Sequence, residues 1–358
     1  MAAAKRPGTK ARAGKRRGAR AEGAARAERA HGKAGPAAAS KPAVLVTGAA
    51  GYLGRLTVET LAGRRKDLAA LVALDVRSVP SAERRPGVEY VDGDIGDPKL
   101  AELIGTHGID TVVHLASIVR APKGAPEDLA YRVDVLGTRN VLAACVRNGV
   151  KRLIVTSSGA AYGYHADNAP WLDEEDPIRG NDEFPYSRHK RLVEEMLAEH
   201  RVSHPELAQL VLRPGTILGD GTSSPITDLF EKPVILGVAG SDSPFVFIWD
   251  RDVVACIVAG VLDGKTGIFN LAGDGAMTTR EIARRLGKPY LPIPAELLGA
   301  ALGVLKTLGL TQYGPEQVRF LRYRPVLANR RLKRDFGFTP TYTSREVFDL
   351  WWRRKRAG

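Results

Sequence analysis

Short apolar runs alternate with longer segments of helical spacing over most of the chain. The runs predict buried strands, because they are about four to eight residues long and rich in Val, Leu, Ile and Ala. They cover residues 43–47, 68–75, 88–92, 111–116, 151–158 and 209–214. Between them, residues 52–63 and 136–149 have the length and apolar spacing of helices. This repetition predicts an α/β fold, with a Rossmann-type doubly wound parallel sheet covered by helices on both faces.

The alternation loosens after about residue 214, where prolines interrupt it. Thr278 and Glu281 predict a capped helix start. The apolar stretch 297–310 contains Lys306 and is too short to span a membrane. It is either a core or subunit-contact helix or a segment that lies on a lipid surface. We expect one domain over 42–215 and a smaller substrate-binding part over 216–350, whose chain can return to the sheet around 245–272.

The charge is concentrated at the amino-terminal end. The chain of 358 residues has a formal net charge of +13, and residues 1–40 contain 11 Lys and Arg but 2 Asp and Glu. This tail has no Val, Leu, Ile or aromatic residue and cannot form a core. We expect residues 1–41 to be a disordered basic tail, mainly solvated, with weak and unspecific binding of polyanions as an alternative.

The remaining composition limits the class of protein. The tail lacks the apolar segment of a secretion signal, and no run in the chain is long enough to span a bilayer. Cys145 and Cys256 are the two cysteines and lie far apart, so neither a disulfide framework nor a metal site is indicated. We expect a cytoplasmic protein. Cys145 fits the apolar face of its predicted helix.

Three glycines follow the first predicted strand, in the sequence VLVTGAAGYLG (44–54). Gly48, Gly51 and Gly54 stand between a strand and a helix, where a phosphate can approach the free amides of the helix start. Asp75 ends the second strand 21 residues after Gly54, at the spacing of an acidic residue that binds ribose hydroxyls. The pattern predicts a dinucleotide site and favours NAD over NADP, although Arg77 nearby could soften the repulsion of a 2′-phosphate.

The spacing Gly-x-x-Gly-x-x-Gly resembles that of the short-chain dehydrogenase/reductase superfamily. Two further segments strengthen the resemblance: YSRHK (186–190) contains Tyr-x-x-x-Lys, and VTSSGAAYG (155–163) resembles the serine segment of the extended branch, the NAD-dependent epimerase/dehydratase family. GDIGD (93–97), DTVVHLAS (110–117), VDVLGTRNVLAAC (133–145) and LKRDFGFTP (332–340) resemble other segments of that branch. The resemblance extends from about Pro42 to Pro340.

The resemblance implies a catalytic group of Ser158, Tyr186 and Lys190. Tyrosine has an ordinary pKa near 10, and a nearby ammonium group favours the phenolate. Tyr186 and Lys190 are four residues apart and therefore share a helix face. Ser157 competes with Ser158 for the substrate-oxygen role, and the distance to the Tyr-Gly pair favours Ser158. A pair of exposed helix residues is the plainer interpretation of Tyr186 and Lys190 taken alone.

The resemblance also implies the cofactor contacts. These are Gly48, Gly51, Tyr52, Leu53, Gly54, Asp75, Asp94, Ile95, Leu115, Ala116, Tyr186 and Lys190. His114 is interpreted as a structural or cofactor-lining residue, and Glu194 as an ion-pair partner on its helix.

The departures from the family pattern concern mainly the substrate. Asp134 replaces a usual Asn, His189 replaces a common Ser, and Thr216 stands where an Asn tends to hold the substrate diphosphate. Three functions stay open: an epimerase or dehydratase of a nucleotide sugar, a dehydrogenase or reductase of an apolar alcohol or ketone, and a non-catalytic cofactor-sensing or polyanion-binding protein. The partners expected are a small-molecule substrate and, by resemblance, a second copy in a homodimer.

Overall fold

The computed structural model describes residues 40–120, 122, 124–242, 244–310 and 314–357, together with Ala2. The chain divides into two units, Met1–Ser40 and Lys41–Gly358, and the fold described below belongs to the second. The basic tail predicted over 1–41 lies outside the described residues except at Ala2, Ser40 and Lys41.

Seven parallel strands form the main sheet, in the order β10-β6-β5-β4-β1-β2-β3. The order reverses between β1 and β4, and in open α/β sheets a ligand binds beyond the carboxyl ends of the strands at such a point. The strands are β1 (Ala43–Thr47), β2 (Ala70–Asp75), β3 (Glu89–Asp92), β4 (Thr111–His114), β5 (Arg152–Thr156), β6 (Ala208–Pro214) and β10 (Gly267–Leu271).

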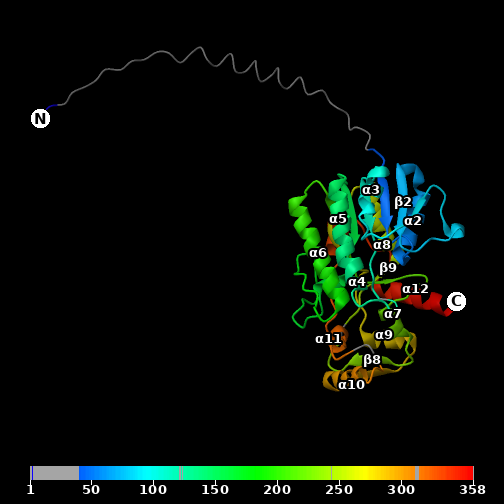
Figure 1. The fold of residues 1–358 in the computed structure, drawn as a ribbon. Coiled ribbons are helices and arrows are strands. Elements are labelled where there is room, and N and C mark those ends of the chain that lie inside the picture. Colours follow the sequence, from blue (N-terminus) through cyan, green and yellow to red (C-terminus); the bar gives the residue numbers. More distant parts are fainter. Residues whose placement is uncertain are drawn as a thin grey trace, which may run out of the picture. The chain divides into compact units, whose positions relative to one another are not determined.

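Helices cover both faces of this sheet, because alternate strand residues point to opposite sides. In β1, Val44 and Val46 pack with α2 (Tyr52–Gly63) and α8 (Asp250–Leu262). Leu45 belongs to the other core, with α3 (Lys99–Thr106), α5 (Thr138–Arg147) and α6 (Pro185–Ser203). Figure 1 shows α5 and α6 side by side on this second face. The predicted doubly wound α/β fold is confirmed.

A smaller part with its own core follows β6. Two parallel strand pairs, β7 with β9 and β8 with β11, lie outside the main sheet. Phe230, Phe247, Phe348 and Trp351 fill the core of this part. Its elements are β7 (Thr216–Leu218), α7 (Pro225–Glu231), β8 (Ile235–Val238), β9 (Phe247–Trp249), α9 (Thr279–Leu286), β11 (Tyr290–Ile293), α10 (Ala295–Thr307), α11 (Gln317–Arg322) and α12 (Ser344–Ala357).

Local predictions can be compared with these elements. The capped start of α9 is confirmed: the Thr278 hydroxyl accepts from the Glu281 amide, and the Glu281 carboxylate accepts from the Thr278 amide. Cys145 is buried in α5, as predicted. The interpretation of 297–310 as a core helix is wrong, because Leu298 is the one buried residue of α10, whereas a subunit contact or a lipid-surface segment stays a prediction. None of the helices within the described residues is both long enough and apolar enough to cross a membrane.

Candidate active site

The glycine turn joins β1 to α2 at the point where the strand order reverses. Gly48 has a φ of +70°, and a Cβ atom there would lie 2.5 Å from the backbone nitrogen of Ala116. A Cβ atom on Gly54 would lie 2.0 Å from the Gly48 carbonyl oxygen. Any other residue at these two positions would push the turn away from β4 or push α2 away from the turn. The glycines therefore keep three backbone segments in close contact.

Asp75 fixes the same turn from the end of β2. One of its carboxylate oxygens accepts a hydrogen bond from the Ala50 amide at 2.9 Å, and the other accepts from the Arg77 amide at 2.9 Å. The Arg77 guanidinium lies farther away, at 3.4 Å, and its side chain is 66% exposed. Asp75 therefore stands beside the turn with a carboxylate already oriented by two backbone amides.

The start of α2 has amides that no side chain caps. Its N-terminal residue, Gly51, makes no side-chain capping bond, and the first turn of the helix carries no acidic residue. Amides in this position attract an anionic group, because they point along the positive end of the helix dipole. Tyr52 and Leu53 begin the helix, but their side chains make contacts away from these amides. The Tyr52 hydroxyl donates to Asp250 at 2.6 Å, and Leu53 packs against the core.

The loops after β3 and β4 complete this edge. Asp94 is exposed and its carboxylate accepts from the Gly96 amide at 2.8 Å, whereas Ile95 is buried. Asn140 of α5 donates to the Ile95 carbonyl at 2.6 Å and so holds this loop, a role that the sequence analysis missed. Leu115 and Ala116 follow β4, half-buried beside the glycine turn.

Tyr186, Lys190 and Ser158 lie where α6 meets the end of β5. The Lys190 ammonium donates to the Thr156 carbonyl at 3.3 Å and lies 5.5 Å from the centre of the Tyr186 ring. Ser187 donates to the Ala160 carbonyl at 2.6 Å. Thr156 and Ala160, the residues two positions before and after Ser158 in the chain, are therefore both hydrogen-bonded to α6. Its hydroxyl oxygen accepts from the Ala160 amide at 3.1 Å and remains half-buried.

Ser157 has a different environment. It is buried, and its hydroxyl donates to Glu194 at 2.6 Å. Glu194 also binds Arg213 of β6, with a shortest separation of 2.6 Å, and both side chains are 4% exposed. Burial lowers the pKa of Arg213, but Glu194 outweighs it and raises the pKa above the ordinary value. Glu194 therefore joins α6 to the sheet through Arg213. The expected ion pair along its own helix is wrong. An arginine inside an apolar strand was the signal for this pair.

The two departures in the helices contact each other. His189 Nδ1 lies 3.3 Å from an Asp134 oxygen, and both side chains are almost completely buried. The second Asp134 oxygen accepts from the Ile118 amide at 2.9 Å. Burial alone would raise the pKa of Asp134, but His189, the charge of Lys190 and the Ile118 amide together lower it. His189 and Asp134, the two departures noted in the sequence, are therefore coupled in one buried contact.

His114 is fully buried and held by two threonines. Its ring nitrogens lie 2.8 Å from the Thr47 hydroxyl and 2.9 Å from the Thr138 hydroxyl. Burial, aided by the nearby Lys190 charge, lowers the pKa of His114 to about 4. These contacts tie β4 to β1 and α5, in keeping with the structural interpretation of this histidine.

An aromatic pocket adjoins Tyr186. Tyr186 packs in one cluster with Tyr164, Phe184, Phe320 and Tyr323. Burial raises the pKa of Tyr164 to about 12. A pocket of about 410 Å³ lies beside this cluster; its lining residues are Tyr164, His165, Ala166, Val318, Arg319, Arg322 and Tyr323. This combination of rings and guanidinium groups leaves no local pattern in the sequence, because α11 is far from Tyr186 along the chain.

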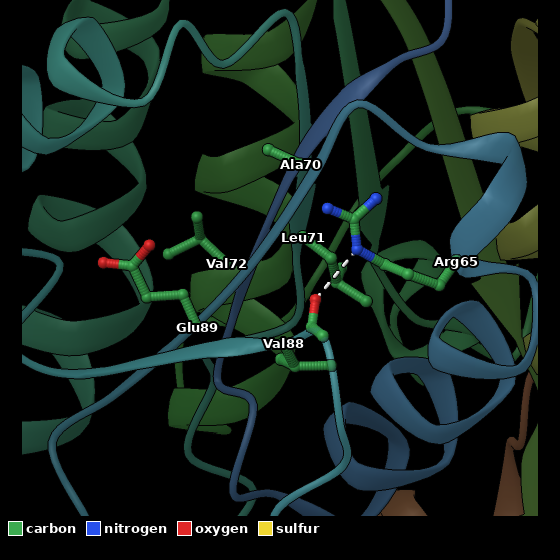
Figure 2. A pocket seen from close by; sticks show the side chains of 7 residues that line it. Arg65, Ala70, Leu71, Val72, Val88 and Glu89 are labelled. Carbon is green, nitrogen blue, oxygen red and sulfur yellow. Dashed lines mark hydrogen bonds between the residues drawn. The ribbon is translucent and has the colours of Figure 1, made fainter.

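Two other features lie apart from this group. Thr216 begins β7 and is half-buried, with its amide bound to Val246 outside the main sheet. A second pocket, of about 300 Å³, lies where β2 and β3 begin. Figure 2 shows Arg65 crossing it, and the Arg65 Nε donates to the Gly87 carbonyl at 2.9 Å. Because strands β2 and β3 start there, this pocket is at the opposite edge of the sheet from the glycine turn.

The strand order and the glycine turn define a Rossmann-type doubly wound fold of the dinucleotide-binding kind, as the sequence predicts. The chain belongs to the NAD dependent epimerase/dehydratase family, whose model matches residues 44–263.

Individual relatives agree with this assignment. The chain is 33% identical to the N-acetyl-α-D-glucosaminyl-diphospho-ditrans,octacis-undecaprenol 4-epimerase of Escherichia coli O157:H7, over 86% of this chain and 93% of that protein. It is 29% identical to human 3β-hydroxysteroid dehydrogenase type 7, over 81% and 78%. The UDP-glucose 4-epimerase of Thermus thermophilus, solved as a complex with NAD, matches with a TM-score of 0.67 and 22% identity, over 88% of this chain and 99% of that one. This last likeness concerns the fold.

Proposed function

We propose that this protein is an NAD-dependent epimerase or dehydratase of a nucleotide sugar or a similar diphosphate-linked sugar. One observation carries the proposal. Lys190 donates to the Thr156 carbonyl at the end of β5 and lies 5.5 Å from the centre of the Tyr186 ring, and the half-buried Ser158 follows Thr156 by two residues. This group adjoins the carboxyl edge of the sheet, where the glycine turn can receive a dinucleotide. The E. coli relative, by its name, acts on a sugar joined to a lipid through a diphosphate. Lipid-linked sugars are therefore candidate substrates besides nucleotide sugars.

The residues of the turn fit NAD. Gly48 and Gly54 keep the backbone close, the uncapped amides at the start of α2 suit a diphosphate, and Asp75 suits the adenosine ribose. Asp94, Ile95, Leu115 and Ala116 lie on the same edge. The preoriented Asp75 carboxylate favours NAD over NADP, because it repels a 2′-phosphate.

NAD, when bound, accepts a hydride from a carbinol carbon and can return it. In the proposed mechanism, Tyr186 removes the proton from the hydroxyl oxygen as the hydride leaves. Lys190 lies 5.5 Å from the centre of the Tyr186 ring and binds the nicotinamide ribose. Ser158 donates a hydrogen bond to the substrate oxygen as negative charge develops there. Thr216, at the start of β7 in the smaller part, is proposed as a substrate contact.

The experiment is a turnover assay of the full-length protein on a panel of nucleotide sugars and apolar alcohols. It follows product identity together with absorbance of the reduced nicotinamide. The proposal expects a changed sugar without net reduction of NAD. Tyr186→Phe is expected to lower turnover at least about a hundredfold, since a positioned acid–base group contributes 10²–10⁴-fold, while NAD still binds by calorimetry. Near-normal turnover by this variant would refute the assignment of Tyr186.

A second candidate function is a dehydrogenase or reductase of an apolar alcohol or ketone. The 29% identity to human 3β-hydroxysteroid dehydrogenase type 7 and the aromatic pocket beside Tyr186 favour it. It predicts steady accumulation of reduced cofactor from an apolar alcohol in the same assay. The non-catalytic alternative predicts no turnover of either panel.

The remaining organisation is also a proposal. Residues 42–215 hold the cofactor and the reacting groups, and residues 216–350 bind the substrate. We infer a homodimer from the family resemblance, to be measured by sedimentation. Deletion of residues 1–40 is expected to leave turnover unchanged while removing retention on a polyanion matrix.

A further inference from the structure

Exposed apolar side chains are concentrated around α10. Of the twelve large hydrophobic residues that are exposed in the described part of the chain, seven lie between residues 236 and 310. Leu236 and Leu291 are cross-strand neighbours in the β8–β11 pair. The other five belong to α10 and the residues directly after it: Leu297, Val304, Leu305, Leu308 and Leu310. A concentration of exposed large apolar side chains of this kind marks a site of interaction.

One side of α10 is packed and the other is bare. Gly299 and Gly303 let the helix approach Val318 and Pro315, at the base of α11. Leu297, Val304 and Leu308 are spaced by seven and four residues, so they share a single face. They are 64%, 60% and 64% exposed. The helix is therefore anchored to the protein by Leu298 and by small residues, and it presents its other large residues outward.

The region around α10 and α11, residues 277–324, carries the excess positive charge of the folded chain. Residues 277–324 contain eight Lys and Arg and three Asp and Glu, whereas the rest of residues 41–358 contains 34 and 35. Lys306 on α10 pairs with Glu316 at 3.6 Å and Arg319 on α11 pairs with Glu183 at 3.1 Å, and the two cationic side chains are still 51% and 62% exposed. An apolar helix face with cationic surroundings is complementary to an anionic bilayer. A symmetric contact between two copies would instead bring two positive segments together.

The helix α11 connects this surface to the candidate active site. Val318 lines the aromatic pocket and also faces Gly299 of α10. Arg319 and Arg322 line the pocket, and Phe320 packs in the cluster that contains Tyr186. Figure 1 shows α10 and α11 together at the end of this unit that lies away from the main sheet. A diphosphate at the arginines would have its sugar on the side of Tyr186 and the rest of the molecule near α10.

We propose that α10 rests on the surface of an anionic lipid bilayer, and that the site acts on a sugar joined through a diphosphate to a membrane lipid. The substrate part of this proposal rests on the function proposed above, whereas the docking part does not. The apolar face of α10 enters the boundary of the bilayer, Lys306 of α10 meets anionic headgroups, and the two α11 arginines that line the pocket meet the diphosphate.

The docking test compares Val304→Glu with Val202→Glu in the full-length protein. Val202 is an 85% exposed valine on α6, so the second variant makes the same chemical change away from α10. The probes are vesicles of phosphatidylglycerol with phosphatidylcholine, and both variants keep the same basic tail, so its contribution to binding cancels in the comparison. We expect Val304→Glu to weaken vesicle binding about tenfold or more, because a charge enters the apolar face. We expect Val202→Glu to bind like the unchanged protein.

Equal vesicle binding by the two variants would overturn the docking proposal. A loss of dimer on Val304→Glu, with unchanged vesicle binding, would also overturn it and identify α10 as a subunit contact. The substrate test compares a polyprenyl-diphospho-N-acetylhexosamine in these vesicles with the corresponding UDP-sugar in solution. We expect Val304→Glu to slow turnover of the lipid-linked sugar alone. Turnover of the UDP-sugar only, by the unchanged protein, would refute the lipid-linked substrate and leave the proposed function intact.

Discussion

The buried contact between Asp134 and His189 gives the most direct test of how this chain departs from its family. Removing His189 by His189→Ser leaves one oxygen of a carboxylate that is 1% exposed without its donor. A buried group that loses its hydrogen-bond partner costs about 1–3 kcal/mol. The edge contact between the His189 and Tyr131 rings, with centroids 5.6 Å apart, is also lost and contributes about 0.5–1.5 kcal/mol.

We therefore expect His189→Ser to destabilise the protein by about 1.5–4.5 kcal/mol. This loss of stability does not exceed the about 3–5 kcal/mol expected when a buried charge loses its only partner. The reason is that the Ile118 amide and the Lys190 charge still stabilise the Asp134 carboxylate. The double variant Asp134→Asn with His189→Ser removes the stranded charge while keeping an acceptor for Ile118. It is expected to recover at least about 1 kcal/mol relative to His189→Ser, as expected for residues in direct contact.

The assay is urea unfolding of the two single variants and the double variant, with the free energy of unfolding taken from linear extrapolation. The double variant also restores the Asn and Ser that the family usually has, so its cofactor affinity should equal that of the unchanged protein. Strict additivity of the two single effects would refute the reasoning, because it would mean that Asp134 and His189 do not stabilise each other.

Two further predictions concern single side chains. Ser158→Ala is expected to lower turnover about tenfold or more with little change in stability, whereas Ser157→Ala should cost about 1–2 kcal/mol of stability through the lost bond to Glu194; the reverse assignment in turnover and urea assays would make Ser157 the substrate contact. Asp75→Ala is expected to weaken NAD binding more than NADP binding, because it removes the carboxylate beside the turn; an unchanged ratio of the two dissociation constants would disprove the basis of the NAD preference.

Much of the fold was predictable because it rests on local patterns. The strands and the helix α2 follow from apolar runs and spacing, and the glycine turn follows from three residues whose backbone must pass close to Ala116. Even the choice between Ser157 and Ser158 began with a count along the sequence. The environments now give it a physical basis, since Ser157 is committed to Glu194.

Features that depend on distant segments were not predictable in the same way. The aromatic pocket joins Tyr164 to Phe320 across the fold, and the Tyr52 hydroxyl reaches Asp250, so neither leaves a local pattern. The contact between Asp134 and His189 was visible only as two separate departures from the family. The stretch 297–310 looked apolar enough for a core, and only its position beside α11 reveals that one face stays bare.

Hydride transfer within a single turnover tests the central claim most directly. The full-length protein, loaded with NAD and mixed with excess sugar substrate, is followed by rapid absorbance of the nicotinamide while the sugar product is identified. The proposed mechanism predicts that reduced nicotinamide forms transiently, never exceeds the amount of protein, and disappears as the changed sugar is released. Continued accumulation of reduced nicotinamide beyond one equivalent would contradict it and would assign the protein to the dehydrogenases.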